Sequence, residues 1–409
     1  MHHPLTRPGR RRALPVPLGL LAALTLTACG ADPADEPADD ASASATPHGY
    51  VAGAQELPEP QLQLSYLDAE GSAHALDLLT EDDTELGETG AADAFASDGR
   101  FLFAVSEDAG EMTIVDTGTW TVDHGDHTHY YRAPAQVAGT LDWSGEVQAA
   151  SSETLTAVFS PTTGTGVLLD RADLGSGQVT ELARIDTGPH RGAVIPLGNR
   201  VVVTDPTSVT ALDSSGEPLP GDGVECIDPR GGLATRVGVV VSCADGAVLA
   251  TGTDDGVDFE RIPYPAPVAD ADRAAALDNR PGRPSVAAPA GTGGVWLLDT
   301  RAREWQLLPT DTPWVTAVAA DDDADRVVGV DTAGRVVVLE PASGTTTASE
   351  PLLPVDRLDE VDLQVDPDRA YVNVPGAGQL LEIDYADDVR LARTFPTAVD
   401  PAHLAETGR

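Results

Sequence analysis

The sequence predicts an all-β protein, specifically a β-propeller, and three observations support this fold class. Short β-rich runs recur along most of the chain, each followed by a Gly/Asp turn and a second β-rich run. These units are spaced roughly 35 to 55 residues apart, a period typical of four-stranded propeller blades. Apart from a short stretch at Asp270 to Leu277, no segment has a helical period.

The first 28 residues read as a lipoprotein signal peptide rather than as part of the fold. Four arginines precede an apolar stretch, Leu14 to Thr27, that is too short for a stable membrane span. The following LTACG fits a bacterial lipobox with Cys29 as the lipidated residue; an ordinary secretory signal is the alternative. Residues 29–49, rich in Ala, Asp, Glu, Pro and Ser, are expected to be a lipidated disordered tether, and residues 50–409 a single propeller domain.

Seven repeat units favour seven blades, with eight as the alternative. A further hairpin at 61–79 either closes the ring against the C-terminal blade or forms a blade of its own. The seven units occupy residues 99–117, 155–171, 199–215, 237–253, 284–300, 325–341 and 368–384.

The charge balance excludes two classes of ligand. After residue 28 the chain has 21 arginines, no lysine and 66 acidic residues, which gives a formal charge of −45 with neutral histidines. Such a surface repels nucleic acid and anionic lipid, so we expect no nucleic-acid partner and contact with the membrane only through the lipid anchor. It attracts cations, although solubility alone also explains many of these carboxylates.

The two remaining cysteines are expected to form a disulfide. With Cys29 assigned to the lipid, Cys226 and Cys243 remain as a pair in an exported, oxidising compartment. The segment between them can fold back as neighbouring strands, and closing this loop contributes roughly 3 kcal/mol in the chain-entropy model.

Propeller geometry brings distant segments together at the central axis. The loops that enter the innermost strands converge there, and their polar and aromatic residues are candidates to line a ligand site. These residues are Asp93, His190, Asp228, Arg230, Trp314 and Asp362.

The segment DHGDHTHYYR concentrates potential metal ligands. Three of the nine histidines lie within six positions, flanked by two aspartates. Imidazole and carboxylate suit Zn²⁺, although Cu²⁺ would bind the same ligands more tightly. We expect His127 and His129 to point to opposite sides, with a turn at Gly125 folding one of them towards His124. The alternative is a solvated or pH-sensitive loop. The candidate ligands are Asp123, His124, Asp126, His127 and His129, with His190 as a separate candidate.

Together these features resemble AztD-type zinc metallochaperones, which are exported β-propellers associated with a zinc ABC importer. The resemblance rests on HGDHTHYYR, the Cys226 and Cys243 pair, PHRG at His190 and the final AETGR, and it spans roughly residues 50 to 409. It implies Zn²⁺ as the bound metal and delivery to the importer's solute-binding protein, with His190 at a channel-side position.

The chain departs from this family pattern at two positions. Gln136 and Arg230 stand where the family favours histidine. Because a guanidinium cannot ligate a metal, zinc is expected to be held chiefly by the histidine segment together with a carboxylate.

Other functions remain open from the sequence. One alternative is a metal-free surface propeller that binds protein or carbohydrate, and another is a propeller hydrolase. The chain has no G-x-S-x-G motif, no evident axial glutamate cluster and no cysteine available as a nucleophile, so we expect no catalytic residues and no enzyme activity. We expect a monomer.

Overall fold

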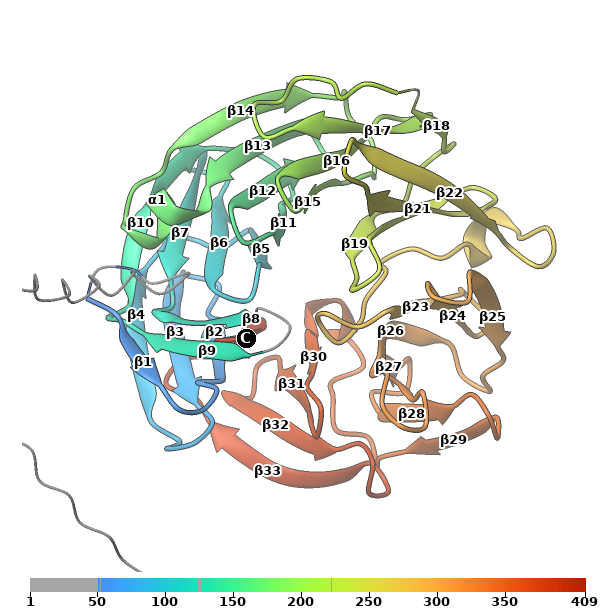
Figure 1. Cartoon of the computed structure of the whole chain (residues 1–409). Helices are drawn as coiled ribbons and strands as arrows, with labels where there is room; N and C mark the ends of the chain where they lie inside the picture. The colour runs from blue at the N-terminus through green and yellow to red at the C-terminus, as the bar shows by residue number, and fades with distance from the viewer. Residues whose placement is uncertain (1–50, 52, 124–126, 222) are drawn as a thin grey trace, which may run out of the picture. The chain divides into compact units, whose positions relative to one another are not determined.

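The described residues form eight β-sheets arranged around a central axis like the blades of a propeller (Figure 1). The structure, a computed structural model, describes residues 51, 53–123, 127–221 and 223–409. The all-β propeller prediction is confirmed. The propeller has eight blades, which was the alternative number, and not the favoured seven. The hairpin at 61–79 belongs to a blade of its own.

Seven blades have four strands and one has three. Listed from the axis outward, blade 1 consists of β34 (His403–Thr407), β2 (Gln63–Leu67), β3 (Ser72–Asp77) and β4 (Asp83–Glu88). Blade 2 consists of β5 (Ala94–Ser97), β6 (Phe101–Ser106), β7 (Glu111–Asp116) and β10 (Gln136–Asp142). Blade 3 consists of β11 (Gln148–Ser151), β12 (Leu155–Ser160), β13 (Thr165–Asp170) and β14 (Glu181–Asp186). Blade 4 consists of β15 (Val194–Leu197), β16 (Arg200–Thr204), β17 (Ser208–Asp213) and β18 (Val224–Glu225).

The second half of the ring repeats this order. Blade 5 consists of β19 (Gly232–Ala234), β20 (Val239–Cys243), β21 (Gly246–Gly252) and β22 (Val257–Pro263). Blade 6 consists of β23 (Ser285–Pro289), β24 (Val295–Asp299) and β25 (Glu304–Leu308). Blade 7 consists of β26 (Trp314–Ala319), β27 (Val327–Asp331), β28 (Val336–Glu340) and β29 (Thr345–Ala348). Blade 8 consists of β30 (Leu363–Val365), β31 (Ala370–Val374), β32 (Gln379–Asp384) and β33 (Arg390–Pro396).

Few other elements are present among the described residues. A ninth, smaller sheet consists of β1 (Gln55–Leu57), β9 (Thr128–Arg132) and β8 (Thr119–Asp123). The helical elements are α1 (Arg171–Gly175), η1 (Asp270–Asp272) and η2 (Leu358–Glu360).

The ring is closed by pairing its two ends. Strand β34 lies antiparallel to β2, so the inner strand of blade 1 comes from the far end of the chain. The Oγ atoms of Ser65 and Thr407 are 2.8 Å apart across this closure, although the residues are 342 positions apart in sequence. No edge is left open between the first and last blades, which removes a site for unwanted strand pairing.

The core consists of apolar layers between neighbouring blades. The second strand of each blade is buried on both faces, because one blade packs on each side of it. All six residues of β6 and all five of β20 are buried. The side chains of Phe101 and Phe103 are fully buried in this way, between blades 2 and 3. Burial of this kind explains the continuous apolar runs in the repeats, where a half-exposed strand would alternate.

The two faces of the ring carry different loops. The chain enters each inner strand at one face, here called the entry face, and makes its first turn within the blade at the opposite exit face. Residues preceding three inner strands, Ala92, Asp362 and Ala402, line a common cavity of about 260 Å³ at the entry face. Residues that end inner strands, among them Ser97 and Ser151, line a larger central cavity of about 720 Å³.

Candidate metal site

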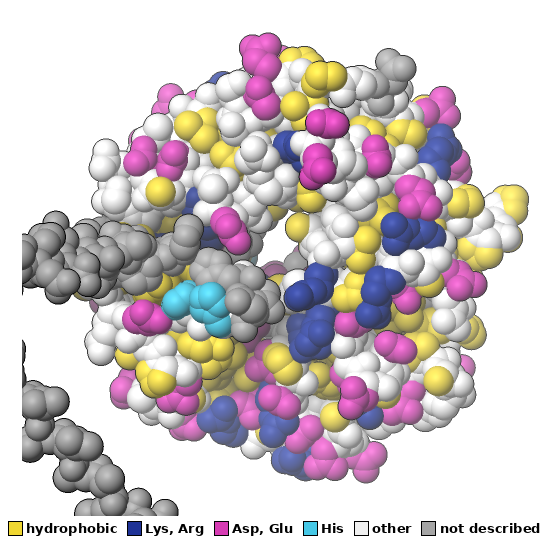
Figure 2. Space-filling model, viewed as in Figure 1, with side chains coloured by type: hydrophobic (Ala, Val, Ile, Leu, Met, Phe, Trp, Pro, Cys, Tyr) yellow, Lys and Arg dark blue, Asp and Glu magenta, His cyan; other side chains and the backbone are white. Residues whose placement is uncertain are grey.

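A β-hairpin that carries the histidines lies on the exit face. Strands β8 and β9 are inserted between β7 and β10, the third and outermost strands of blade 2. Because Asp116 at the end of β7 pairs with Phe101 at the start of β6, the chain enters the hairpin from the exit face. In Figure 1 the hairpin extends from blade 2 towards the centre of the ring, and Figure 2 shows the cyan histidines on this face.

The base of the hairpin is fixed by aromatic and charged contacts. The rings of Trp120 and Tyr131 stack with centroids 5.3 Å apart. The Arg100 guanidinium lies over the Trp120 ring at 3.7 Å and forms a buried, two-fold hydrogen-bonded ion pair with Asp116, with distances of 2.7 and 3.0 Å. These contacts hold the hairpin at a defined angle to blade 2.

Alternation along the strands gives the hairpin two faces. Thr121 and Asp123 on β8 line the central cavity. Val122, which is opposite His129, belongs to the other face together with Trp120 and Tyr131. The hairpin therefore places a carboxylate at the cavity and an imidazole on its outer side.

His127 and His129 lie together. Their ring centroids are 4.9 Å apart with nearly perpendicular planes. The expectation that they point to opposite sides is wrong, because residues two apart in an extended segment share a face.

Glu56 orients His129. On β1, Glu56 is opposite Tyr131 of β9, and its Oε1 accepts a 2.7 Å hydrogen bond from Nδ1 of His129. A carboxylate only accepts, so the proton lies on Nδ1 and the lone pair of the imidazole lies on Nε2. This is the arrangement in which a histidine is prepared to bind a metal, with a carboxylate behind it.

The remaining predicted ligands are only partly described. Asp123 is exposed at the tip of β8, whereas His124 and Asp126 lie outside the described residues. Within the part of the chain that the structure describes, no three His, Cys, Asp or Glu side chains are grouped closely enough to hold a metal ion. Of the predicted site, the structure thus describes the imidazoles of His127 and His129 as a pair, with Glu56 hydrogen-bonded to His129.

His190 lies at the other end of the ring. Its Nε2 is 2.7 Å from the hydroxyl of Thr204, and its Nδ1 is 2.9 Å from the carbonyl oxygen of Gly188. It precedes the inner strand β15, on the entry face, so at least one inner strand of about 13 Å separates it from the hairpin. Gly192 makes room for the ring, since a Cβ there would lie 2.3 Å from Nε2. The structure does not bring His190 together with the histidine hairpin.

Only one of the residues predicted to converge on the axis lines the central cavity. That residue is Asp362, and burial raises the pKa of its carboxyl group. Asp228 and Arg230 instead form a surface ion-pair group with Asp270, in which Arg230 lies 3.2 Å from Asp228 and 2.6 Å from Asp270. Arg230 is one of the two departures from the family pattern. Its charge is therefore neutralised by Asp228 and Asp270 on the entry face. Gln136 begins β10, the outermost strand of blade 2.

Sequence reasoning missed two residues near the site. Glu56 lies in a segment with no recognisable motif, and only the pairing of β1 with β9 shows its role. Asp278 lines the central cavity because Asp278 and Asn279 pair with β23 and β26 in the inner position of blade 6. Burial raises the pKa of Asp278 to about 7, while the guanidinium of Arg409 opposes this shift.

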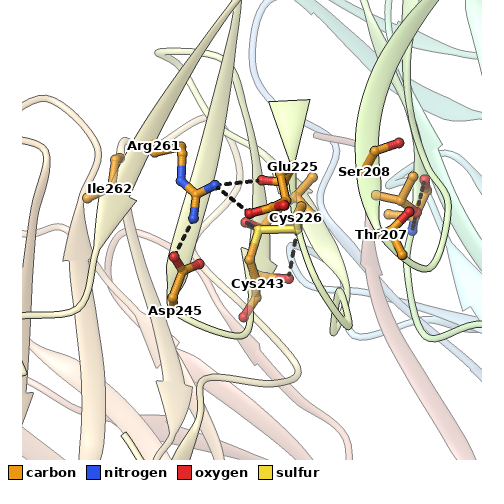
Figure 3. Close-up of a disulfide and its surroundings, with 12 residues drawn as sticks. Thr207, Ser208, Glu225, Cys226, Cys243, Asp245, Arg261 and Ile262 are labelled. Atoms are coloured by element: carbon orange, nitrogen blue, oxygen red, sulfur yellow. Dashed lines mark hydrogen bonds and ion pairs between the residues drawn. A yellow bond between two sulfur atoms is a disulfide. The ribbon is translucent and has the colours of Figure 1, made fainter. Parts of the chain in front are cut away.

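The predicted disulfide between Cys226 and Cys243 is present, with the two Cα atoms 5.1 Å apart (Figure 3). Cys226 follows β18 of blade 4 and Cys243 ends β20 of blade 5, so the bond joins the connection between two blades to the second of them. Arg261 contacts Glu225 and Asp245 beside it. Both sulfurs are buried.

No helix among the described residues has the length and apolar character that a bilayer span requires.

Fold and site together define an eight-bladed β-propeller with a histidine-bearing hairpin over one end of its central cavity. Among solved structures, apo AztD from Citrobacter koseri superposes with a TM-score of 0.71 and 17% identity, covering 85% of this chain and 98% of that chain. A second crystal structure of Citrobacter koseri AztD gives a TM-score of 0.70 and 18% identity with the same coverage. The dihydro-heme d1 dehydrogenase NirN in complex with DHE is more distant, with a TM-score of 0.51, 15% identity, and coverage of 86% and 76%. The chain thus has an AztD-type fold, as its sequence features predict. No family model and no curated protein sequence matches it.

Proposed function

We propose that this protein is an extracytoplasmic zinc metallochaperone that captures Zn²⁺ on the histidine hairpin. It delivers the ion to the solute-binding protein of a zinc ABC importer. The observation that carries this proposal is the pair of imidazoles of His127 and His129 on the exit face, with Glu56 hydrogen-bonded to His129. The AztD-type fold supports it.

The ligand set suits transfer better than storage. Two imidazoles form a partial set, to which Asp123, His124 and Asp126 would add further donors. A closed four-ligand cage would hold zinc tightly, whereas an incomplete set leaves positions for the ligands of an acceptor. The acceptor's ligands can then enter before the donor's leave. Acid opposes capture, because protonation removes the lone pair of each imidazole.

Export and anchoring complete the proposal. Residues 1–28 would direct secretion, Cys29 would carry the lipid, and residues 29–49 would tether the propeller of residues 50–409 to the outer face of the cell membrane, as a monomer. The buried disulfide between Cys226 and Cys243 supports an oxidising compartment. No catalytic role is assigned to any residue.

Metal analysis and a transfer assay test this function. Tag-free protein should retain zinc after gel filtration and lose it to a chelator. With free zinc buffered to a negligible level, the variant with His124, His127 and His129 all replaced by alanine should load the solute-binding protein at least about 10-fold more slowly, as expected when several ligands are removed. A His190→Ala variant is the matched control for capture, because His190 lies at the other face.

The control also tests the second predicted ligand position. If His190 belongs to a separate zinc site, His190→Ala lowers the stoichiometry while transfer from the hairpin persists. Wild-type loading rates in the triple variant would show that the hairpin is not the site of capture.

A further inference from the structure

The arginines of this protein are almost all paired with acids. Among the 21 arginines after residue 28, all but four lie in an ion pair with a carboxylate of the described residues. The four exceptions are Arg200, Arg236, Arg280 and Arg283. In a chain with 66 acidic residues, an arginine without a carboxylate partner is the exception, so the position of these four is informative.

All four lie on one side of the exit face. Arg200 begins β16, the second strand of blade 4, and Arg236 lies in the first turn of blade 5, between β19 and β20. Arg280 and Arg283 lie in the corresponding segment of blade 6, between the inner position at Asn279 and β23. These are three consecutive blades.

Two of these turns, those of blades 5 and 6, border the central cavity. Ala234, two residues before Arg236, and Pro281 and Gly282, between Arg280 and Arg283, line the cavity that Thr121 and Asp123 of the hairpin line from another side. Figure 2 shows dark-blue arginine side chains gathered near the centre of this face, with the cyan histidines on the other side of it. The side of the hairpin that carries Thr121 and Asp123 thus borders the same space as the turns with the arginines, whereas His129 lies on the hairpin's other face.

The charges of these arginines are not neutralised locally. Arg236 and Arg283 are exposed, and their guanidinium groups have no hydrogen bond or ion pair within the described part of the chain. Arg200 donates only to the backbone oxygen of Asp254, at 3.1 Å. Arg280 is buried and donates to the backbone oxygens of Ala320 and Asp321, so it supports the turn from within. We call Arg200, Arg236 and Arg283 the arginine rim.

We propose that the arginine rim is the docking surface for the protein that receives the cargo, and that this acceptor presents carboxylates to it. This inference rests on the proposed function. A guanidinium binds a carboxylate through two parallel hydrogen bonds, which fixes orientation as well as attraction. The rim arginines come from separate turns of three blades, an arrangement that fits an extended protein surface rather than one small anion.

Docking at the rim would place the acceptor against the hairpin. Because acidic residues outnumber arginines in the chain, the rim marks an orientation in which the approach of an acidic partner is favourable. Its effect is expected in the association rate and in the dependence of that rate on salt.

Charge reversal tests the rim without touching the metal ligands. Association of the zinc-free protein with the zinc-free solute-binding protein is measured by stopped flow at low and high ionic strength. The double variant Arg236→Glu and Arg283→Glu should associate about 10-fold more slowly at low ionic strength, and the difference should shrink as salt screens the charges. The conservative pair Arg236→Lys and Arg283→Lys keeps both charges and should keep most of the rate.

A matched control separates the rim from net charge. Arg184→Glu with Arg390→Glu changes the total charge by the same amount at two exposed arginines that already have acidic partners. This control should associate at close to the wild-type rate. Equal slowing in both reversals, or no slowing in the rim reversal, would overturn the docking surface.

Zinc content, measured separately, distinguishes the two proposals. A rim reversal that slows association while wild-type protein binds no zinc would leave the docking surface standing and refute the zinc function. Binding of inorganic phosphate to the protein is the remaining measurement. Saturable phosphate binding at the rim, with acceptor association unaffected by the reversal, would show that the rim serves a small anion and would overturn protein docking.

Discussion

The hydrogen bond between Glu56 and His129 links the histidine hairpin to a strand that belongs to no blade. Glu56 is about half exposed and His129 about one fifth exposed, so solvent reaches the pair mainly on the carboxylate side. The carboxylate selects the Nδ1-protonated form of the imidazole and thereby directs its lone pair. Glu56 is therefore a positioning residue for the proposed zinc ligand.

Replacing Glu56 by alanine should lower zinc affinity about 10-fold, as expected when the partner of a metal-binding histidine is removed. Competition with a chromophoric chelator measures the change, and nitrogen-15 spectra report which ring nitrogen of His129 is protonated. Glu56→Gln retains an acceptor oxygen and should retain the Nδ1-protonated form. Exposed Glu153, in the turn between β11 and β12, provides the control substitution Glu153→Ala. An unchanged affinity in Glu56→Ala would remove the positioning role.

The sequence could predict the histidines but not their orienting partner. Three imidazoles within six residues are visible as a local pattern, and the pairing of Cys226 with Cys243 is expected from the cysteine count. Glu56 is 73 residues from His129, and the contact depends on a strand pairing that no local pattern encodes. The same holds for Asp278, whose place in the cavity follows from isolated bridges to two neighbouring strands.

Glu406 should make stability depend on pH. It is 2% exposed, its Oε1 has no hydrogen-bond partner among the described residues, and burial raises the pKa of its carboxyl group from 4.5 to about 7. The native state therefore holds the proton more tightly than the unfolded state. Its contribution is fully present below about pH 4.5 and is lost as the pH rises to about 7. We expect this loss to be about 3 kcal/mol.

Chemical denaturation at pH 5 and pH 8 measures this effect. Glu406→Gln cannot ionise, so the fall in the free energy of unfolding between these pH values should be smaller than in the wild type. Glu153→Gln, at an exposed position, corrects for the general repulsion among surface carboxylates. The same pH dependence in all three proteins would contradict the assignment to Glu406.

At the scale of elements, the hairpin and the disulfide have separate roles. The hairpin is an insertion between two strands that pair directly, β7 and β10, so blade 2 is complete without it. The disulfide lies three blades away, where the chain passes from blade 4 to blade 5. Changes in one are therefore expected to leave the other intact.

Replacing Cys226 and Cys243 by serine should destabilise the propeller by about 3 kcal/mol, because a loop with a sequence separation of 17 residues is no longer closed in the unfolded chain. Zinc stoichiometry should not change. Thermal unfolding with and without reductant measures the effect, since reductant should lower the midpoint of the wild type and not that of the variant. A loss of zinc in the variant would show that the bond supports the metal site.

The repeats predicted the middle strands of the blades better than the inner and outer ones. Each repeat corresponds to the second and third strands of a blade, which are mostly buried and therefore mostly apolar, as in β6 and β7. Inner strands are short, such as the three residues of β19, and outer strands alternate weakly. The count of seven missed blade 1 because its inner strand, β34, is remote from its other three in sequence.

At the scale of the whole molecule, the fold should not depend on metal. Apolar layers between all eight blades form the core, and the described residues contain no cluster of ligands on which these layers rest. Chelation should leave the far-UV circular dichroism and the cooperative melt unchanged. Conversion to a coil spectrum would instead indicate a structural metal, because the free energy of binding such a metal stabilises the folded state.

Closing the ring with β34 has a consequence for how the chain folds. The inner strand of blade 1 is synthesised after all the other blades, so one edge of β2 is unpaired while those blades form. Contacts between such distant segments slow folding, and an exposed strand edge invites pairing with other chains in the meantime. The ring therefore stays open until residues 403–407 have been synthesised and can pair with β2.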